Sequence, residues 1–329
     1  MKHSFYILLC LLCAFSNAIA DNLPWQDAHI PGINREPMYA HFIPFINEQA
    51  ALLQLSLPDT KRFELNTATE RRICLDGTWK FKYSKNDSQS PKDFFKRNYN
   101  VNNWQNIQVP GSWELQGFDA PIYTDVTYPF PANPPYVPND YNPVGTYVRE
   151  FSVPETWKEM DIFIDFEGVE SAYYLWINGE QVGYSEDSRL PAHFNIGRYL
   201  KKGANRIAVK VFRYSDGSYL EDQDYWKYSG IERSVFILAR PKSRVNDFKL
   251  VASLCNKYKD GDFNLDLRLN QPSKGETIEI KVLDKAGKTI YRQERAVNSA
   301  AESLVSFKQI FPKVKQCNAE TPYLHTLVV

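Results

Sequence analysis

The chain has 329 residues, of which 39 are basic and 39 acidic, so its formal net charge is zero. This balance provides no electrostatic basis for binding nucleic acid or an anionic membrane surface. The length predicts about two domains, and the 20 Tyr, 20 Phe and 7 Trp side chains favour half-buried β structure with a ligand-binding surface.

The start of the chain has the pattern of an export signal. Lys2 and His3 form a polar start, residues 5–15 are almost wholly apolar, and Ala18-Ile19-Ala20 fits a small-x-small cleavage site. The apolar run is too short for a comfortable membrane span. We therefore predict a signal peptide at residues 1–20, no transmembrane segment after its removal, and a periplasmic or secreted protein.

Three cysteines lie beyond this signal, at Cys74, Cys255 and Cys317. Their wide spacing and odd number indicate neither a disulfide framework nor a zinc site. The sequence allows one disulfide in an oxidising compartment, but it does not identify which two of these cysteines would form it.

Residues 21–70 show little periodicity and are predicted to form an extended N-terminal arm, with a short helix within residues 47–57. Between residues 71 and 240, short segments of strand character follow one another between turn residues. The predicted strands are 79–83, 104–110, 147–151, 161–166, 172–177, 182–184, 194–196, 207–214 and 234–238. Because no repeated helices separate them, we predict an all-β fold with a jelly-roll sandwich at residues 71–240.

A proline-rich and aromatic section interrupts these strands at residues 121–143. Its prolines exclude a central strand or a long helix. Two interpretations remain open, a stiff rim of a binding site and a structural loop that covers a sheet edge.

Aromatic residues become sparse after residue 240. Strands of immunoglobulin type are predicted at 248–251, 263–269, 277–282, 289–293 and 304–307. We predict a smaller immunoglobulin-like sandwich at residues 241–329. It ends on the strand-like residues 326–329, which suggests an incomplete domain.

The most unusual stretch is 214–226, which follows a predicted strand and is both acidic and aromatic. Its carboxylates are Asp216, Glu221, Asp222 and Asp224, and its large rings are Tyr214, Tyr219, Tyr225 and Trp226. Crowded carboxylates require cations, hydrogen-bond donors or a hydroxyl-rich ligand. A sugar can stack on the rings and donate its hydroxyl protons to the acids. The alternatives are a polyol or metal site and a solvated acidic turn.

A series of motifs in a fixed order resembles the N-terminal part of bacterial β-galactosidases, which are family-two glycoside hydrolases. They are residues 32–35, 75–79, 109–113, 122–129, 133–135, 168–172, 183–189, 214–226 and 319–322. The resemblance implies a galactose-binding-like jelly roll and an immunoglobulin-like domain, followed in the family by a (β/α)₈ barrel that carries two catalytic glutamates. We identify neither glutamate here. Asn47-Glu48 is similar to the family's acid/base dipeptide, but it lies in the arm without a barrel strand.

The resemblance also implies roles for individual residues. Asp224 matches an acid that binds a sodium ion and a galactose hydroxyl, and Asp125 replaces an Asn that contacts the sugar. Glu186 and Asp216 match positions that hold magnesium in some relatives, although a further ligand position falls at Pro24, whose side chain cannot bind. Carboxylate oxygens suit both ions. The tryptophans Trp79, Trp104, Trp113, Trp176 and Trp226 are interpreted as core residues.

We therefore expect the N-terminal portion of an exported β-galactosidase, whose partners are β-galactoside glycans, the catalytic barrel and, in the full-length protein, a possible homo-oligomer. This portion alone is expected to be inactive. The first alternative is a non-catalytic carbohydrate-binding module, and a structural or interaction protein is the least specific reading.

Overall fold

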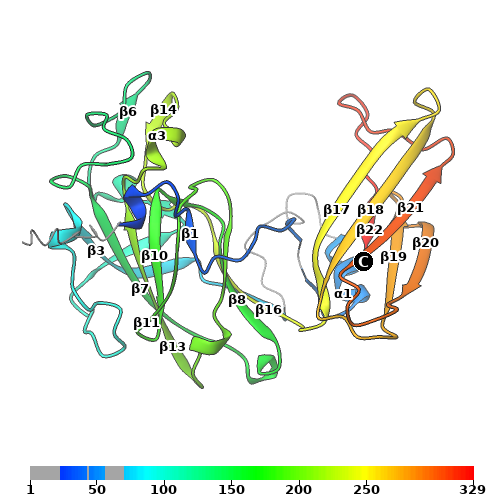
Figure 1. The fold of residues 1–329 in the computed structure, drawn as a ribbon, viewed down its shortest axis with the longest axis horizontal. Coiled ribbons are helices and arrows are strands. Elements are labelled where there is room, and N and C mark those ends of the chain that lie inside the picture. The colour runs from blue at the N-terminus through cyan, green and yellow to red at the C-terminus, as the bar shows by residue number, and fades with distance from the viewer. Residues whose placement is uncertain (1–22, 43, 56–69) are drawn as a thin grey trace, which may run out of the picture.

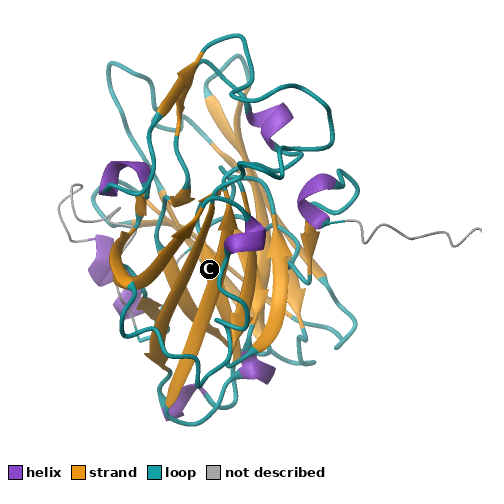
Figure 2. Cartoon of the chain, turned by 90° about the vertical axis from the view of Figure 1, so that its left-hand side faces the viewer, coloured by secondary structure: helices purple, strands orange, loops and turns teal. Residues whose placement is uncertain are grey.

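A computed structural model describes residues 23–42, 44–55 and 70–329. The predicted signal peptide lies outside these residues. The described fold is almost entirely β, which confirms the predicted all-β class (Figure 2). Every helix in the described ranges is too short or too polar to be a membrane span.

The first group of strands forms a sandwich of a seven-stranded and a four-stranded sheet (Figure 1). In spatial order, the larger sheet contains β1 (Gly32–Ile33), β11 (Glu180–Ser185), β10 (Ala172–Ile177), β13 (Ala204–Phe212), β7 (Val144–Ser152), β3 (Gly77–Ser84) and β4 (Gln105–Val109). The smaller sheet contains β12 (Ala192–Asn195), β8 (Asp161–Phe166), β16 (Val235–Arg240) and β2 (Arg72–Cys74). All neighbouring strands in both sheets run antiparallel.

One hydrophobic core lies between these sheets. Ile207 and Val209 of the larger sheet and Ile164 and Ile237 of the smaller sheet are fully buried in it. Such residues alternate with others along their strands because successive side chains point to opposite faces. The alternation in the sequence thus predicts which face of β13 points into this core, although Ala208 and Phe212 on the opposite face are also buried, at 1% exposure each.

Short elements complete the first sandwich. The strands are β5 (Gly111–Ser112), β15 (Gly230–Ile231) and β9 (Val169–Glu170) in one small sheet, and β14 (Tyr225–Lys227) paired with β6 (Ile122–Thr124) in another. The helices are α3 (Ser218–Glu221) and the 3₁₀ turns η1 (Pro24–Gln26), η2 (Asp87–Gln89), η3 (Glu114–Gln116), η4 (Glu155–Trp157) and η5 (Gly197–Tyr199).

The described part of the N-terminal arm packs into the fold. Trp25 is 7% exposed, and its ring stacks on Phe212 with centroids 4.1 Å apart. The arm then adds β1 to the edge of the larger sheet. Further along, α1 (Glu48–Leu55) confirms the predicted short helix. Glu48 accepts two hydrogen bonds of 2.7 Å from Lys281 Nζ, so this glutamate is used in a contact with the second sandwich.

The second sandwich consists of two three-stranded sheets (Figure 1). One contains β17 (Arg244–Cys255), β18 (Asp260–Asn270) and β21 (Leu304–Phe311), and the other contains β20 (Thr289–Ala296), β19 (Thr277–Leu283) and β22 (Thr326–Val328). Leu265, Leu267, Ile280 and Val305 are fully buried between the sheets. The predicted small β-sandwich is therefore present.

Two arginines fix the short connection between β16 and β17. Arg240 Nη2 donates to the carbonyl oxygens of Val245 and Asn246, at 3.1 Å each. In the opposite direction, Arg244 Nη1 donates to Asp161 Oδ2 at 2.6 Å. Each sandwich thus supplies a cation to an acceptor on the other.

Candidate functional site

The candidate site is the β6–β14 ribbon, in which Tyr123 lies opposite Trp226 and Thr124 opposite Tyr225. Asp125 directly follows β6 and Asp224 directly precedes β14. The Tyr123 ring lies beside Trp226, its hydroxyl contacts Asp224, and the charge of Asp125 acts on the same hydroxyl. We call the surface formed by Tyr123, Asp125, Asp224 and Trp226 the ribbon face.

The contacts of these side chains agree with that register. The Tyr123 hydroxyl donates a hydrogen bond of 2.5 Å to Asp224 Oδ1, along the diagonal of the ribbon. The Tyr123 and Trp226 rings lie with their centroids 5.6 Å apart. The hydrogen bond to Asp224, followed by the charge of that carboxylate, raises the pKa of Tyr123. Tyr123 thus fixes the orientation of one carboxylate oxygen.

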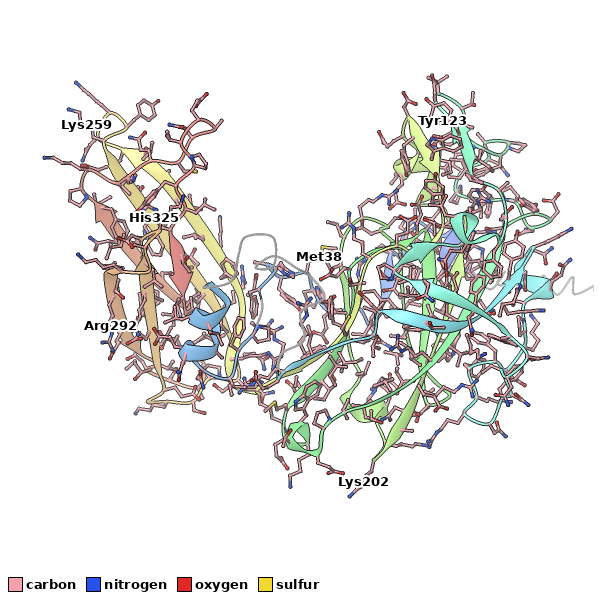
Figure 3. All side chains as sticks on the ribbon, turned by 180° about the vertical axis from the view of Figure 1, so that it is seen from behind. Met38, Tyr123, Lys202, Lys259, Arg292 and His325 are labelled. Carbon is pink, nitrogen blue, oxygen red and sulfur yellow. The ribbon has the colours of Figure 1, made fainter. Side chains whose placement is uncertain are left out.

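The ribbon face is open to solvent. Tyr123 is 53% and Trp226 50% exposed, and both aspartates are exposed. The ribbon and α3 project from one end of the first sandwich (Figure 1). Tyr123 lies at the opposite end of this sandwich from Lys202 (Figure 3). Two acids and two ring faces are therefore available to a ligand at this end.

The exposure of Trp226 corrects its interpretation as a core residue. The other four tryptophans of that set are buried as predicted, with Trp104 the most exposed at 9%. Trp226 differs because it belongs to a two-stranded ribbon whose face no layer of the described residues covers. Its apolar neighbours in the sequence do not reveal that difference.

The carboxylates of the acidic stretch 214–226 have different roles. Glu221 accepts hydrogen bonds from the backbone and the hydroxyl of Ser188, at 2.8 and 2.5 Å. Asp222 forms an ion pair with Lys227, which is 7% exposed. These two acids hold the loop in place, while Asp224 faces solvent. The stretch is therefore more than a solvated acidic turn.

Glu186 and Asp216, the predicted magnesium residues, lie together in a second place. Both are only 7% exposed, and each carboxyl influences the pKa of the other. Burial raises the pKa of Glu186 to about 9, and the Asp216 charge adds to this effect, whereas the Tyr184 hydroxyl bond opposes it. Burial likewise raises the pKa of Asp216.

The surroundings of the pair contain further buried oxygen atoms. Asp216 Oδ1 is buried and has no hydrogen-bond partner among the described residues, and the same holds for Ser215 Oγ. Within those residues, no group of three His, Cys, Asp or Glu side chains is arranged to hold a metal ion. Two carboxylates and a hydroxyl suit a hard cation that keeps several water ligands, as Mg²⁺ does.

Comparison with known families decides what kind of domain carries this site. Residues 73–241 match the family "Glycosyl hydrolases family 2, sugar binding domain". The chain belongs to glycosyl hydrolase family 2. The matched range contains the ribbon face and the Glu186–Asp216 pair, so both lie in the family's sugar-binding domain.

Family 2 relatives with similar sequences are named β-galactosidases. The chain is 41% identical over 265 residues to the enzyme of Priestia megaterium, covering 78% of this chain and 26% of that protein. It is 47% identical over 245 residues to the enzyme of Pectobacterium atrosepticum, covering 74% and 22%. The chain therefore spans about a quarter of the length of these curated relatives.

Solved structures of β-glucuronidases share the fold at lower identity. A calcium-binding mutant of Bacteroides uniformis β-glucuronidase 2 aligns with a TM-score of 0.62 and 18% identity, over 78% of this chain and 30% of that one. A β-glucuronidase described as belonging to glycoside hydrolase family 2 gives 0.61 and 21%, over 80% and 29%. These likenesses establish the β-sandwich architecture alone.

The sequence predicts Asp125 and Asp224 as site residues, but it does not identify Tyr123 as the partner of Asp224. The signal was available in principle, because Tyr123 and Asp125 are two apart, as are Asp224 and Trp226. It becomes informative only after the two short segments are known to pair across about 100 residues of chain.

Proposed function

We propose that this chain is the sugar-binding portion of a β-galactosidase and that its ribbon face binds the terminal, non-reducing β-galactose of the substrate. One observation supports this most: two carboxylates and two exposed rings share one face within a family 2 sugar-binding domain. Carboxylates accept protons from sugar hydroxyls, and rings stack on the C–H face of a pyranose. The names of the relatives favour galactose as that sugar.

The whole protein would hydrolyse terminal β-galactosides with retention of configuration. That reaction requires two carboxyl groups about 5–5.5 Å apart, one as acid/base and one as nucleophile. We assign both to a (β/α)₈ barrel that works beside this chain, since the chain spans about a quarter of its relatives. Asp224, Asp125 and Tyr123 would bind and orient the galactose without taking part in proton transfer at the glycosidic bond.

Binding by the chain tests the first part of this proposal. We expect methyl β-galactoside to bind in isothermal titration, and Asp224→Asn to weaken binding about tenfold or more, since a hydrogen bond to a charged group contributes about 1.5–3 kcal/mol. Glu180→Gln, at an exposed acid of β11, is the matched control and should bind normally. Equal affinity of Asp224→Asn and wild type would contradict the assignment.

Activity tests the second part. The purified chain should not release chromophore from a chromogenic β-galactoside. Turnover by the chain, abolished by substitution of one of its own acids, would show that a catalytic pair lies within these residues.

We assign sodium to Asp224 and magnesium to Glu186 and Asp216 as further parts of the proposal. A cation there would offset the like charges of buried or crowded carboxylates. Mg²⁺ should raise the unfolding temperature of the wild-type chain, and Glu186→Gln should weaken that response. No difference between the two proteins across a Mg²⁺ titration would remove Glu186 from the site.

Export to the periplasm or cell exterior is the proposed location, supported by the pattern of residues 1–20. The mass of the N-terminal peptide from the native host tests it. A start near Asp21 is expected, and a retained Met1 would refute cleavage.

A free-standing carbohydrate-binding module is the second candidate. It is favoured by the exposed rings along residues 123–141, where Tyr136 is 57% and Tyr141 40% exposed. In that case Tyr136→Ala should abolish glycan binding, whereas Asp224→Asn should leave it intact. The first proposal predicts the reverse.

A further inference from the structure

The β6–β14 ribbon is too small to fix its own geometry. Each of its strands has three residues, and an isolated two-stranded ribbon is at best marginally stable in water. The ribbon projects from one end of the first sandwich (Figure 1). Lys227, the last residue of β14, is buried, whereas Asp224, directly before this strand, is exposed. The ribbon therefore has a buried base at Lys227 and an open end at Asp224, and its geometry depends on what holds the base.

Arg213 contacts the backbone of both segments at this base. It directly follows β13, and its side chain is 1% exposed. Its Nη2 donates to the carbonyl oxygens of Ala120, at 3.2 Å, and of Lys227, at 3.4 Å. Lys227 pairs with Ile122, the first residue of β6, and Ala120 lies two residues before it. One guanidinium group at the end of a core strand thus holds both segments of the ribbon where they leave the sandwich.

Asp119 orients this guanidinium and connects it to two further parts of the fold. Its Oδ2 accepts hydrogen bonds from Arg213 Nη1, at 2.7 Å, and from the hydroxyl of Tyr83 in β3, at 2.9 Å. Its Oδ1 accepts from the hydroxyl of Tyr141, at 2.8 Å. Tyr141 lies near the far end of the proline-rich section, residues 121–143. The carboxylate therefore joins both ends of this long section to the larger sheet.

The backbone of Asp119 indicates a role for its carboxylate. Its φ of 116° lies in the range that favours glycine. Such a conformation in a residue with a side chain persists only where the surroundings impose it, and it clusters at functional sites. Because the side chain makes all three bonds to Arg213, Tyr83 and Tyr141, we attribute the presence of aspartate here to those bonds.

Burial makes the anchor rigid. The Asp119 side chain is 10% exposed, and the carboxylate of Glu114, which is also buried, lies 3.7 Å from Arg213 Nη2. Two carboxylates therefore balance the buried guanidinium charge. A donor or acceptor that left this arrangement would lose its partner without gaining water, which is costly. The planar fork of arginine can bind several acceptors at once, as it does here.

A small movement at the base produces a large one at the open end. Asp224 is three residues from Lys227, which corresponds to about 10 Å along an extended strand. A tilt of about 10° over that length moves the carboxylate by roughly 2 Å. Hydrogen bonds form only over a range of about 0.5 Å in length. The orientation of the base thus decides whether Asp224 meets a given ligand hydroxyl.

We propose that Arg213, oriented by Asp119, is a positioning residue of the ribbon face. It fixes the base of the ribbon and thereby the place of the Asp224 carboxylate and of the Tyr123 hydroxyl bonded to it. Arg213 and Asp119 act through these two side chains and do not contact the sugar. The inference rests on the proposed function where sugar affinity is measured, whereas the geometry of the ribbon is measured without a ligand.

Hydrogen exchange of the full chain tests the anchor without a sugar. Arg213→Gln should speed the exchange of ribbon amides, in residues 122–124 and 225–227, about tenfold or more, because the ribbon opens locally. Arg206→Gln is the matched control. Arg206 lies in β13, is 6% exposed and donates to the carbonyl oxygen of Arg97 at 2.9 Å. Loss of this comparably buried guanidinium should leave the exchange of the ribbon amides unchanged.

Two milder variants keep the test decisive if Arg213→Gln folds poorly. Arg213→Lys retains the charge but replaces the fork by a single nitrogen. Asp119→Gly suits the φ of 116° and removes only the carboxylate. Each should speed the exchange of the ribbon amides relative to wild type. Wild-type exchange of these amides in both variants would overturn the anchor.

Calorimetry with methyl β-galactoside tests the consequence for the site. Arg213→Lys should lower the affinity about three- to tenfold, since the Asp224 carboxylate is no longer held in place, and Arg206→Lys should not. In an Asp224→Asn background, Arg213→Lys should have little further effect, because the group that it positions has lost its charge. An equal loss of affinity in both backgrounds would show that Arg213 acts on the fold in general, and would contradict the positioning role.

The outcomes separate this inference from the proposal beneath it. If methyl β-galactoside binds wild type through Asp224 and binds Arg213→Lys equally tightly, the positioning role is wrong and the proposed function stands. If the sugar does not bind and Asp224→Asn changes nothing, the proposed function fails. The exchange of the ribbon amides in Arg213→Lys and Asp119→Gly then decides by itself whether the anchor holds the ribbon.

Discussion

At the scale of single residues, the Tyr123–Asp224 hydrogen bond links a neutral donor to a carboxylate on an open surface. The hydrogen bond of 2.5 Å favours the protonated form of Tyr123, because an ionised Tyr123 would place a second negative charge beside Asp224. Asp224→Asn should therefore move the titration of Tyr123 to lower pH. Ultraviolet difference titration, with Tyr123→Phe to assign the signal, measures this shift. An unchanged tyrosine titration in Asp224→Asn would show that the two side chains are not coupled.

The buried carboxyl of Glu186 should make the stability of the chain depend on pH. Burial, with the Asp216 charge, raises its pKa from 4.5 to about 9. The folded state therefore binds the proton more tightly than the unfolded state, and the stabilisation that this gives is complete below about pH 4.5 and is lost as pH rises towards 9. Glu186→Gln, which remains neutral, should be more stable than wild type at pH 9 by on the order of 1–2 kcal/mol without added metal.

Denaturant unfolding at several pH values measures this difference. Buried Glu114, Glu167 and Glu170, whose pKa values are raised to about 7, 7 and 8, weaken both proteins alike as pH rises. Only the difference between the variants reports on Glu186, and Glu180→Gln is the matched control. A stability difference that stays constant from pH 5 to pH 9 would contradict the raised pKa of Glu186.

At the scale of elements, β7 depends on a glycine. A Cβ on Gly145 would overlap the ring of Trp113 and lie 2.8 Å from Phe81, both of them buried. Gly145→Ala should destabilise the chain by about 1–3 kcal/mol, as overpacking of a core does. Gly197→Ala is the control, since its nearest neighbour would be Asn195 Oδ1 at 3.4 Å. Equal unfolding midpoints for the two variants would mean that the core rearranges freely around β7.

The strands differ in how far the sequence predicts them. Alternation identifies β13 and the face that it turns to the main core, while the burial of its opposite face is not predicted. Asn178-Gly179 identifies the hairpin of β10 and β11, where both residues adopt positive φ, of 54° and 95°. The sequence does not predict the ribbon of β6 and β14. Each strand has three residues, Pro121 directly precedes β6, and the pairing depends on the sandwich between them. Local patterns carry no information about such a long-range contact.

The same limit applies to the candidate site. Composition and resemblance point to Asp125, Asp224, Glu186 and Asp216. The structure places the first two around Tyr123 and the other two in a separate buried pair. The exposure of Trp226 follows instead from the tertiary structure, in which the described part of the chain leaves the ribbon face uncovered. That property belongs to the tertiary structure and not to the neighbours of Trp226 in sequence.

At the scale of the whole molecule, the two sandwiches are joined by reciprocal contacts. Arg244 donates to Asp161 at 2.6 Å, and its guanidinium lies 5.3 Å from the ring centroid of Phe163. Arg244→Gln should loosen the joint, with a larger radius of gyration in small-angle scattering and a loss of about 1–3 kcal/mol of unfolding free energy.

Galactoside affinity should not change in Arg244→Gln, because the ribbon lies at the end of the first sandwich away from this connection (Figure 1). Arg268→Gln, at an exposed position of β18, is the matched control. A scattering curve identical to wild type would indicate that other contacts, such as Glu48 with Lys281, hold the sandwiches without Arg244.

The account depends most on the ribbon face as the place where galactose binds, and a crystal structure of this chain soaked with galactose tests that directly. We expect the sugar on the β6–β14 ribbon, with hydroxyl groups within hydrogen-bond distance of the Asp224 carboxylate and Tyr123 still donating to its Oδ1. Galactose bound elsewhere on the chain, with the ribbon face unoccupied at saturating sugar, would contradict the account.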